Sequence, residues 1–137
     1  MSRRNELAAA YVRRSQARLV ALEVLLEHES WADVVRQSQE IVELLLKALL
    51  RSAGVSPPRL HDVSDVLIAE QSRLPEPLHE HVDEFAGVSR RMRRDRELAF
   101  YGAEDLVPSA FYSREDAETS RDAAQRIFDL IAAHVDH

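Results

Sequence analysis

The sequence predicts an all-α protein, an up-and-down bundle of four main helices plus a short helix, which forms a single domain over residues 1–137. Two observations support this class. Apolar side chains recur at the three- and four-residue spacing of a helical face along each helical segment, and no segment is predicted to be a strand. Apolar residues make up 45% of the chain and aromatic residues 6%, so the core must be filled by Leu, Val, Ile and Ala.

The first two helices are expected over about residues 5–28 and 30–53. At the start of the second, Ser30 and Asp33 resemble a capping box with Asp in place of the usual Glu. Gly54 is expected to end this helix, because glycine takes the left-handed conformation without a Cβ clash. The apolar face of the second helix consists of Trp31, Val34, Val35, Ile41, Val42, Leu45 and Leu49. Its flanks carry Gln37, Gln39, Glu40, Glu43 and Lys47.

The other helices are expected over about residues 62–72, 78–101 and 113–135. Proline pairs separate the second, third and fourth helices, because proline cannot continue a helix. Ser113 begins the fifth helix, with acidic residues in the first turn that suit the helix dipole. The connection over residues 102–112 is apolar for a loop. It either packs back onto the bundle or covers a site or a partner.

The composition limits the classes of function. The chain has no cysteine, so it forms neither a disulfide nor a Cys-based zinc site. No metal and no cofactor are expected, since phosphate-loop and dinucleotide motifs are missing and His79 and His81 point to different sides of a helix. Without an apolar run of about 18 residues or a signal peptide, we expect a cytoplasmic protein that does not bind membranes. The net charge of −6 does not favour nucleic acid.

The charge distribution is uneven, because the fourth predicted helix carries an arginine cluster. Of the 18 basic residues in the chain, Lys47 is the one lysine. The arginine cluster consists of Arg90, Arg91, Arg93, Arg94 and Arg96. One interpretation is an Arg–carboxylate network that fixes helix register or a dimer interface. Its available counter-charges are Asp95, Glu97, Glu40 and Glu43. The other interpretation is a phosphate-binding patch for nucleotide or RNA. Its members would be Arg90, Arg94, Arg96 and Lys47.

One long stretch of the chain resembles a known family. Residues 31–54, with their Gln, Glu and Lys flanks and the terminal Gly, are followed by the step His61-Asp62. This arrangement resembles the HEPN family, small helical bundles of prokaryotic nucleotide- and RNA-related systems. The resemblance implies a helical bundle. His61 resembles the family's loop His, and we interpret it as a structural residue at the start of the third helix in preference to a substitute for a missing catalytic His.

The resemblance also bears on the fourth helix. Many HEPN ribonucleases carry an Arg, four further residues, a His, and often a Tyr two positions later. The matching positions here hold Arg94, Ala99 and Tyr101. In the family, Arg and His act on the RNA phosphodiester, and the Tyr can be adenylylated by a partner nucleotidyltransferase. A methyl group cannot transfer a proton as an imidazole does, so we expect the ribonuclease activity to be absent or residual.

Three functions are compatible with this resemblance. The first is a homodimeric binding and interaction module, the partner of a minimal nucleotidyltransferase in a toxin–antitoxin-like pair. On this hypothesis the fourth helix lines a dimer cleft, with Tyr101 near it as the site of modification. The second is an active or residual endoribonuclease that uses Arg94 and Tyr101. The third is a nucleotide-binding subunit in which Arg90, Arg94 and Lys47 contact phosphates.

Overall fold

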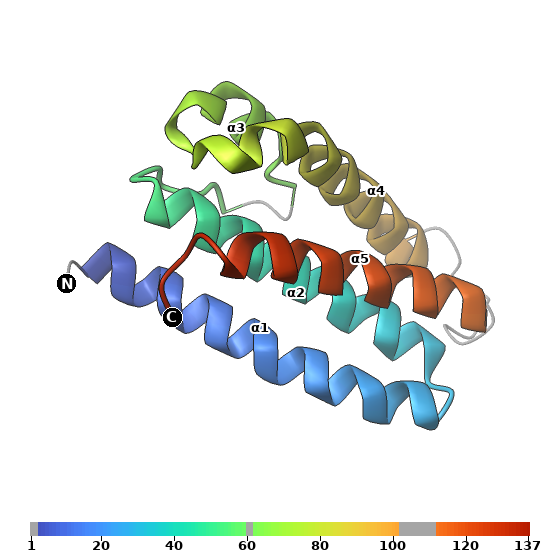
Figure 1. The fold of residues 1–137 in the computed structure, drawn as a ribbon. Helices are drawn as coiled ribbons and strands as arrows, with labels where there is room; N and C mark the ends of the chain where they lie inside the picture. Colours follow the sequence, from blue (N-terminus) through green and yellow to red (C-terminus); the bar gives the residue numbers. More distant parts are fainter. Residues whose placement is uncertain (1–2, 60–61, 102–111) are drawn as a thin grey trace.

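The computed structural model describes residues 3–59, 62–101 and 112–137, and the side chains of residues 3–4 and 95–101 lie outside this description. Within these ranges all regular structure is helical, and no strand occurs. The predicted all-α class is therefore confirmed (Figure 1). None of the described helices is long and apolar enough to span a membrane.

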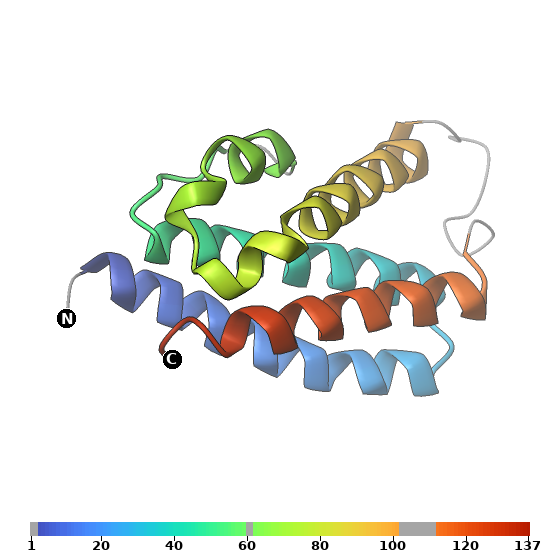
Figure 2. The same cartoon turned by 45° about the horizontal axis from the view of Figure 1, so that its top comes forward.

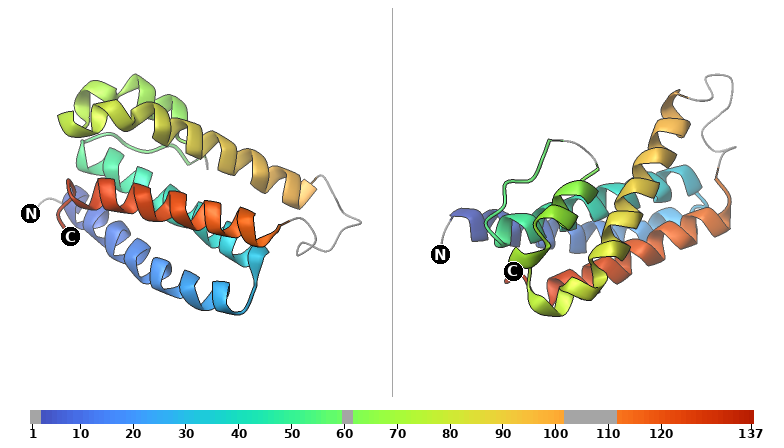
Figure 3. Two further views of the ribbon diagram at one scale, coloured as in Figure 1. Left: turned by 45° about the vertical axis from the view of Figure 1, so that its right-hand side comes forward. Right: turned by 90° about the horizontal axis from the view of Figure 1, so that it is seen from above.

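Four long helices form an up-and-down arrangement. In chain order the elements are α1 (Arg3–Glu27), α2 (Trp31–Ser52), α3 (Ser64–Ala69), the 3-10 helices η1 (Gln71–Arg73) and η2 (Glu76–His81), α4 (Val82–Tyr101) and α5 (Arg114–Ala132). Helices α1 and α4 run in one direction, whereas α2 and α5 run in the other (Figure 1). Helices α1, α2 and α5 pack together, and α3 and α4 lie on the side of α2 that is remote from α1 (Figures 1 and 3).

Helix α2 lies at the centre of the core. The expected apolar face is buried, except that Trp31 is half-buried. Burial also extends to Leu46, Ala48 and Leu50, because α2 packs against α1, α4 and α5 on several sides. Two polar residues, Ser38 and Gln39, are buried on this helix as well. The sequence correctly indicated that polar groups lie close to the apolar face of α2.

The prediction for the C-terminal end of α2 is confirmed, whereas the prediction for its N-terminal end is not. At its C-terminal end Gly54 adopts the left-handed conformation, with φ of 82°. The amide of Val55 donates to Leu50 O at 2.9 Å, and the amide of Gly54 donates to Arg51 O at 3.0 Å. These two bonds form a Schellman motif, which confirms the predicted stop.

The capping box predicted at the N-terminal end of α2 is wrong. Ser30 has φ of −87° and ψ of 70°, which is not the extended backbone of an N-cap, and its side chain accepts no backbone amide. Its hydroxyl instead donates to Asp33 Oδ2 at 2.6 Å. A complete capping box occurs at α5, where Ser113 is extended and exchanges bonds with Asp116.

The third and fourth predicted helices begin later than the sequence indicated. Helix α3 starts at Ser64, because the Asp62 carboxylate accepts the Ser64 amide at 2.9 Å and caps the helix from outside. The remainder of the expected third helix is the separate 3-10 helix η1. The expected start of the fourth helix, at residue 78, lies in η2, and regular α-helix begins at Val82.

Candidate functional site

Helix α4 is attached to the bundle at its N-terminal end and diverges from α5 toward its C-terminal end (Figure 2). Arg126 of α5 holds Glu84 of α4 through bonds of 2.7 Å and 3.0 Å. These bonds lower the pKa of the Glu84 carboxyl below its usual value. The buried side of α4 carries Phe85, Val88 and Met92. On its other side Arg90, Arg91, Arg93 and Arg94 are exposed, away from the core.

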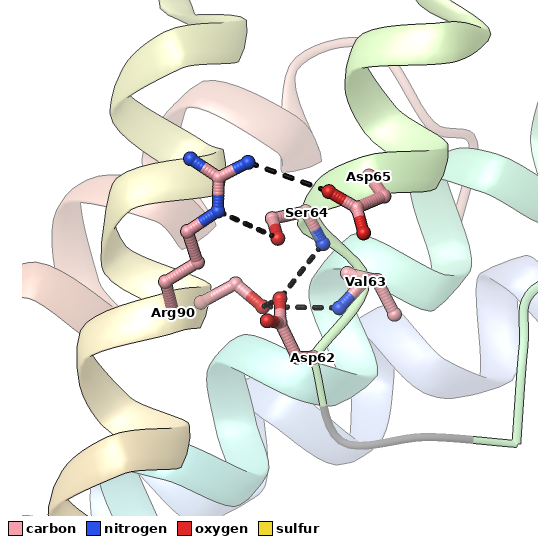
Figure 4. A network of polar contacts seen from close by, with 6 residues as sticks. Asp62, Val63, Ser64, Asp65 and Arg90 are labelled. Carbon is pink, nitrogen blue, oxygen red and sulfur yellow. Dashed lines mark hydrogen bonds and ion pairs between the residues drawn. The ribbon is translucent and has the colours of Figure 1, made fainter.

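A network of polar contacts joins the start of α3 to α4 (Figure 4). The Ser89 hydroxyl accepts the amide of Val63 at 3.1 Å and donates to Asp62 Oδ1 at 3.2 Å. The same carboxylate oxygen accepts the Ser64 amide. Ser89 and Ser64 are buried, so these bonds satisfy groups that would be costly to leave unpaired. The network fixes the position of α3 against α4.

The Asp62 carboxylate is stabilised in its charged form by its surroundings. Burial raises its pKa, but hydrogen bonds from the hydroxyl and amide of Ser64 and from Ser89, together with the charge of Arg93, outweigh burial. The pKa of Asp62 therefore lies below its usual value. Asp62 is the acidic half of the His-Asp step, and its carboxylate accepts the Ser64 amide at the start of α3, where the sequence had suggested a structural role for His61. His61 itself lies outside the described residues.

Arg90 is held by the same region. Its Nε donates to Ser64 Oγ at 3.0 Å, and its Nη2 donates to Asp65 Oδ1 at 3.4 Å (Figure 4). Asp65 is almost fully exposed, so the ion pair contributes little, whereas the bond to the buried Ser64 fixes the guanidinium. For Arg90, the structure thus provides an Arg–carboxylate contact, and the counter-charge comes from α3.

The counter-charge predicted at Glu40 is wrong. Glu40 pairs with Arg18 of α1 at 2.6 Å and lies 3.9 Å from Arg36 of α2. Both ion pairs hold the Glu40 carboxylate on the side of α2 that faces α1. Glu43 accepts from Lys47 at 2.7 Å, one turn along the same helix. Lys47 makes no contact with Arg90 or Arg94 in the described part of the chain.

Two members of the arginine cluster point outward without a described partner. Arg91 and Arg94 are exposed, and they form no hydrogen bond or ion pair to any residue whose side chain is described. Arg90 and Arg94 are four positions apart and therefore lie on one face of α4. The side chains of the other residues predicted for this site lie outside the description: Asp95, Arg96, Glu97, Ala99 and Tyr101.

Gln39 is a site residue whose role sequence reasoning missed. Its side chain is 8% exposed, and its Nε2 donates to the carbonyl oxygen of Met92 at 3.1 Å. This bond joins α2 to α4 within one turn of Arg93 and Arg94. In the sequence, Gln39 lies on a flank of the apolar face of the second helix. Its side chain is polar but uncharged, and this was the one sign that it could be buried and bonded to a neighbouring helix.

Two hollows of the described surface lie apart from the arginine cluster. One of about 350 Å³ at the end of the bundle has polar lining residues that include Asn5, Arg73 and His134. The other, of about 300 Å³, lies between α1 and α2 beside Arg36 and Glu40. No group of three or more metal-ligating side chains occurs among the described residues. The candidate site is the basic surface of α4, on which Arg90, Arg91, Arg93 and Arg94 are exposed.

The comparison with known families covers nearly the whole chain. The model of the HEPN domain matches residues 8–134. This range includes α2, the Asp62 network and the arginine cluster. No curated protein and no solved structure matches the chain.

Proposed function

Because the chain belongs to the HEPN domain family, we propose that it is a dimeric binding and interaction module that does not cleave RNA. Its proposed partner is a minimal nucleotidyltransferase, as in toxin–antitoxin-like pairs. The observation that carries the proposal is the combination of Arg94 with Ala99. The arginine that would bind phosphate is present, whereas the family's proton-transferring histidine is replaced by alanine.

The chemistry of cleavage supports this choice. Breaking a phosphodiester bond requires a proton to be moved to or from a reacting oxygen, and removing such a group typically costs about 10²–10⁴-fold in rate. An arginine stays protonated at neutral pH, so Arg94 stabilises charge without replacing the lost base. An unperturbed phenol has a pKa of about 10, so a tyrosine such as Tyr101 would need a changed environment to act as a base at neutral pH.

The basic surface of α4 supports binding in place of cleavage. Arg91 and Arg94 are exposed and have no described counter-ion, so their guanidinium groups are available for bidentate contacts with phosphate or carboxylate. Arg90 is oriented by Ser64 and Asp65 beside them. Lys47, also proposed as a ligand, is neutralised by Glu43 and contributes less. Arg96 completes the proposed surface.

A reverse substitution tests the absence of cleavage. We expect the native chain to cleave a model RNA no faster than a buffer control. The variant Ala99→His should gain cleavage at least about 100-fold above the native chain, because it restores the missing proton-transfer group beside Arg94. Product formation on a labelled single-stranded RNA measures both rates.

The control for this assay is the double variant Arg94→Ala with Ala99→His, which should lose the gained activity. Cleavage by the native chain that disappears in Arg94→Ala and in Tyr101→Phe would contradict the proposal. That result would favour the alternative, an endoribonuclease that uses Arg94 and Tyr101.

The nucleotidyltransferase partner is tested by intact-mass measurement of the chain purified from its own host. We expect a mass gain of whole AMP units that maps to Tyr101 and disappears in Tyr101→Phe. An unmodified native chain that also remains unmodified when mixed with ATP and a minimal nucleotidyltransferase from the same genome would contradict this part of the proposal.

A nucleotide-binding subunit is the second candidate, and the exposed arginines favour it. Calorimetric titration with ATP distinguishes it from the first. We expect a direct nucleotide site to give heat at millimolar ATP that is lost in the double variant Arg91→Glu with Arg94→Glu. Arg36→Glu, which reverses an exposed charge on the α1–α2 side, should leave that heat unchanged. No heat from the native chain would remove this candidate.

A further inference from the structure

A hollow at one end of the bundle has side chains of both charges in its wall, and the proposed function does not use it. We propose that this hollow, which we call the end hollow, binds a small zwitterion of the α-amino acid class. Its volume is about 350 Å³. It is lined by residues 5 and 8 of α1, 52–53 at the end of α2, 73–75 at the junction of η1 and η2, and 134–136 after α5.

Four segments that are far apart in the sequence form the wall of the end hollow. The first turns of α1, the end of α2 and the segment that follows α5 lie at the same end of the bundle (Figures 1 and 3). The junction of η1 and η2 completes the wall. Since only the folded chain brings these segments together, a ligand bound there should stabilise the native state.

Hydrogen bonds within the wall hold its backbone in place. The carbonyl oxygen of Leu74 accepts from Nε2 of His79 at 2.8 Å, which ties the η1–η2 junction to η2. After α5, the amide of His134 donates to Ile131 O at 2.9 Å. A ligand therefore has little backbone to order when it binds, which lowers the entropic cost of binding.

The inner wall of the end hollow is apolar. Ala8, Leu74 and Val135 line it and are at most 5% exposed. Ala8 and Ala53 have small side chains, which leave room between the larger groups around them. The volume lies near the lower limit of about 300 Å³ for small-molecule sites, so the end hollow favours a compact ligand.

The polar side chains of the wall carry both signs of charge. Arg73 and Asp136 are exposed, and they contribute a guanidinium and a carboxylate. Arg73 lies 3.7 Å from Glu70, but both side chains of this pair are solvated, so the pair contributes little and leaves donors for a ligand carboxylate. Asn5 and His134 add groups that can form hydrogen bonds.

The helix ends are a second source of charge at the end hollow. A helix carries about half a positive charge at its N-terminus and half a negative charge at its C-terminus. The C-terminal ends of α2 and α5 both reach the end hollow, and the first turn of α1 brings the opposite end of a dipole. An ammonium group is thus favoured near Asp136 and the end of α5, and a carboxylate is favoured near Arg73.

A zwitterion matches this wall better than an ion of either sign alone. A simple anion would meet the carboxylate of Asp136 and two negative helix ends, whereas a simple cation would meet the guanidinium of Arg73. An α-amino acid carries both groups on one small molecule, and its side chain can lie against the apolar inner wall. The end hollow therefore offers a partner to each part of an amino acid.

Amide chemical shifts of the full chain, labelled with ¹⁵N, test the inference. Each standard amino acid is titrated separately up to about 10 mM, since a small ligand makes few contacts and binds weakly. We expect at least one to shift the amides of Ala8, Ala53 and Val135 in a saturable way. The matching amine without the carboxylate and the matching acid without the amine should each bind at least about tenfold more weakly.

Two substitutions at exposed positions test the roles of the charges. Arg73→Gln and Asp136→Asn should each weaken binding of the same amino acid about tenfold or more, because each removes one charged partner. Both side chains are exposed, so the thermal unfolding midpoint without ligand should stay the same. Asp129→Asn on α5 and Arg91→Gln on α4 are the matched controls and should leave the affinity unchanged.

Three results would overturn the inference. The first is that no amino acid shifts the amides around the end hollow, or that the shifts centre on the arginine cluster of α4. The second is that the amine or the acid alone binds as tightly as the amino acid. The third is that Arg73→Gln and Asp136→Asn leave the affinity unchanged. None of these results bears on the proposed function, which does not involve the end hollow.

Discussion

At the scale of single residues, Asp62 determines how α3 meets α4. Its carboxylate accepts the Ser64 amide at 2.9 Å and the Ser89 hydroxyl at 3.2 Å. Because Arg90 of α4 donates to the hydroxyl of the same Ser64, the Asp62 carboxylate fixes the start of α3 directly and the Arg90 guanidinium through Ser64. Hydrogen bonds to a charged acceptor are stronger than neutral ones, so this position depends on the ionised state of Asp62.

The ionisation of Asp62 predicts a pH dependence of stability. Its pKa is lowered in the folded chain, so its stabilising contribution is complete above the unfolded-state pKa of about 4 and is lost as the pH falls through the folded value. Asp62→Asn keeps an oxygen acceptor but removes the charge. We expect it to lower the free energy of unfolding by up to about 1 kcal/mol at pH 7 and to have a smaller effect at pH 3. Urea unfolding at both pH values measures the difference.

Asp65→Asn is the matched control, three residues further along the chain. The side chain of Asp65 is 97% exposed, so removing its charge should change the free energy of unfolding by less than about 0.5 kcal/mol at either pH. A stability difference for Asp62→Asn that did not shrink in acid would show that its charge is not what holds α3.

Individual contacts were the part of the site least accessible from the sequence. Burial along α4 follows helical periodicity, since Phe85, Val88 and Met92 recur at the spacing of one helical face and are all buried. It did not identify Asp65 as the partner of Arg90, because that contact depends on where α3 packs. Glu40 was wrongly assigned for the same reason, since its distance from α4 depends on how α2 is rotated in the bundle.

At the scale of elements, two serines at predicted helix starts perform different roles. Ser113 accepts the amide of Asp116 and completes a capping box, whereas Ser30 accepts no amide. Ser113→Ala should therefore lower the free energy of unfolding by about 1 kcal/mol. Ser30→Ala should change it by less than about 0.5 kcal/mol, although both sequences show a serine three residues before an aspartate. Denaturant unfolding of the two variants side by side measures the contrast, and equal losses would contradict it.

The bond between Gln39 and Met92 gives a prediction about the contact of α2 with α4. Gln39→Leu keeps the side-chain volume but removes the donor, so we expect a loss of about 0.5–1.5 kcal/mol in the free energy of unfolding. Gln125→Leu on α5, where the amide is exposed and bonded to Asp129, should cost less than about 0.5 kcal/mol. Thermal unfolding distinguishes the two. If Gln39→Leu were as stable as the native chain, the hydrogen bond from Gln39 to Met92 would not stabilise the contact of α2 with α4.

The helices themselves were largely predictable, and their ends were not. Long periodic segments identify α1, α2, α4 and α5, because burying one face requires the helical spacing whatever the neighbours are. The end of α2 at Gly54 was also predictable, since its left-handed φ suits glycine. The start at Ser30 was not. Capping depends on the backbone angles of the preceding turn, in which Glu29 has φ of 56°.

At the scale of the whole molecule, the fold separates a buried centre from a basic edge. Helix α2 is buried along most of its length between α1, α4 and α5. Helix α4 packs mainly against α2 and α3 and diverges from α5 (Figure 2). Among the four long helices, the arginine cluster therefore lies on the one with the least extensive packing in the described structure.

This separation predicts an order of local stability along the chain. Amides at the centre of α2, around Leu45 and Leu49, should exchange with solvent only when the whole bundle unfolds, because their side chains are fully buried. Amides of α4 around Ser89 and Met92 should exchange at least about tenfold faster after correction for intrinsic rates, because that helix can open without disrupting the contacts among α1, α2 and α5. Hydrogen-exchange mass spectrometry on the native chain measures both segments. Gln39→Leu should accelerate exchange in α4 and leave the centre of α2 unchanged, since it removes a bond that holds α4 alone. Equal protection of the two helices would mean that the arginine cluster belongs to the same cooperative unit as the core.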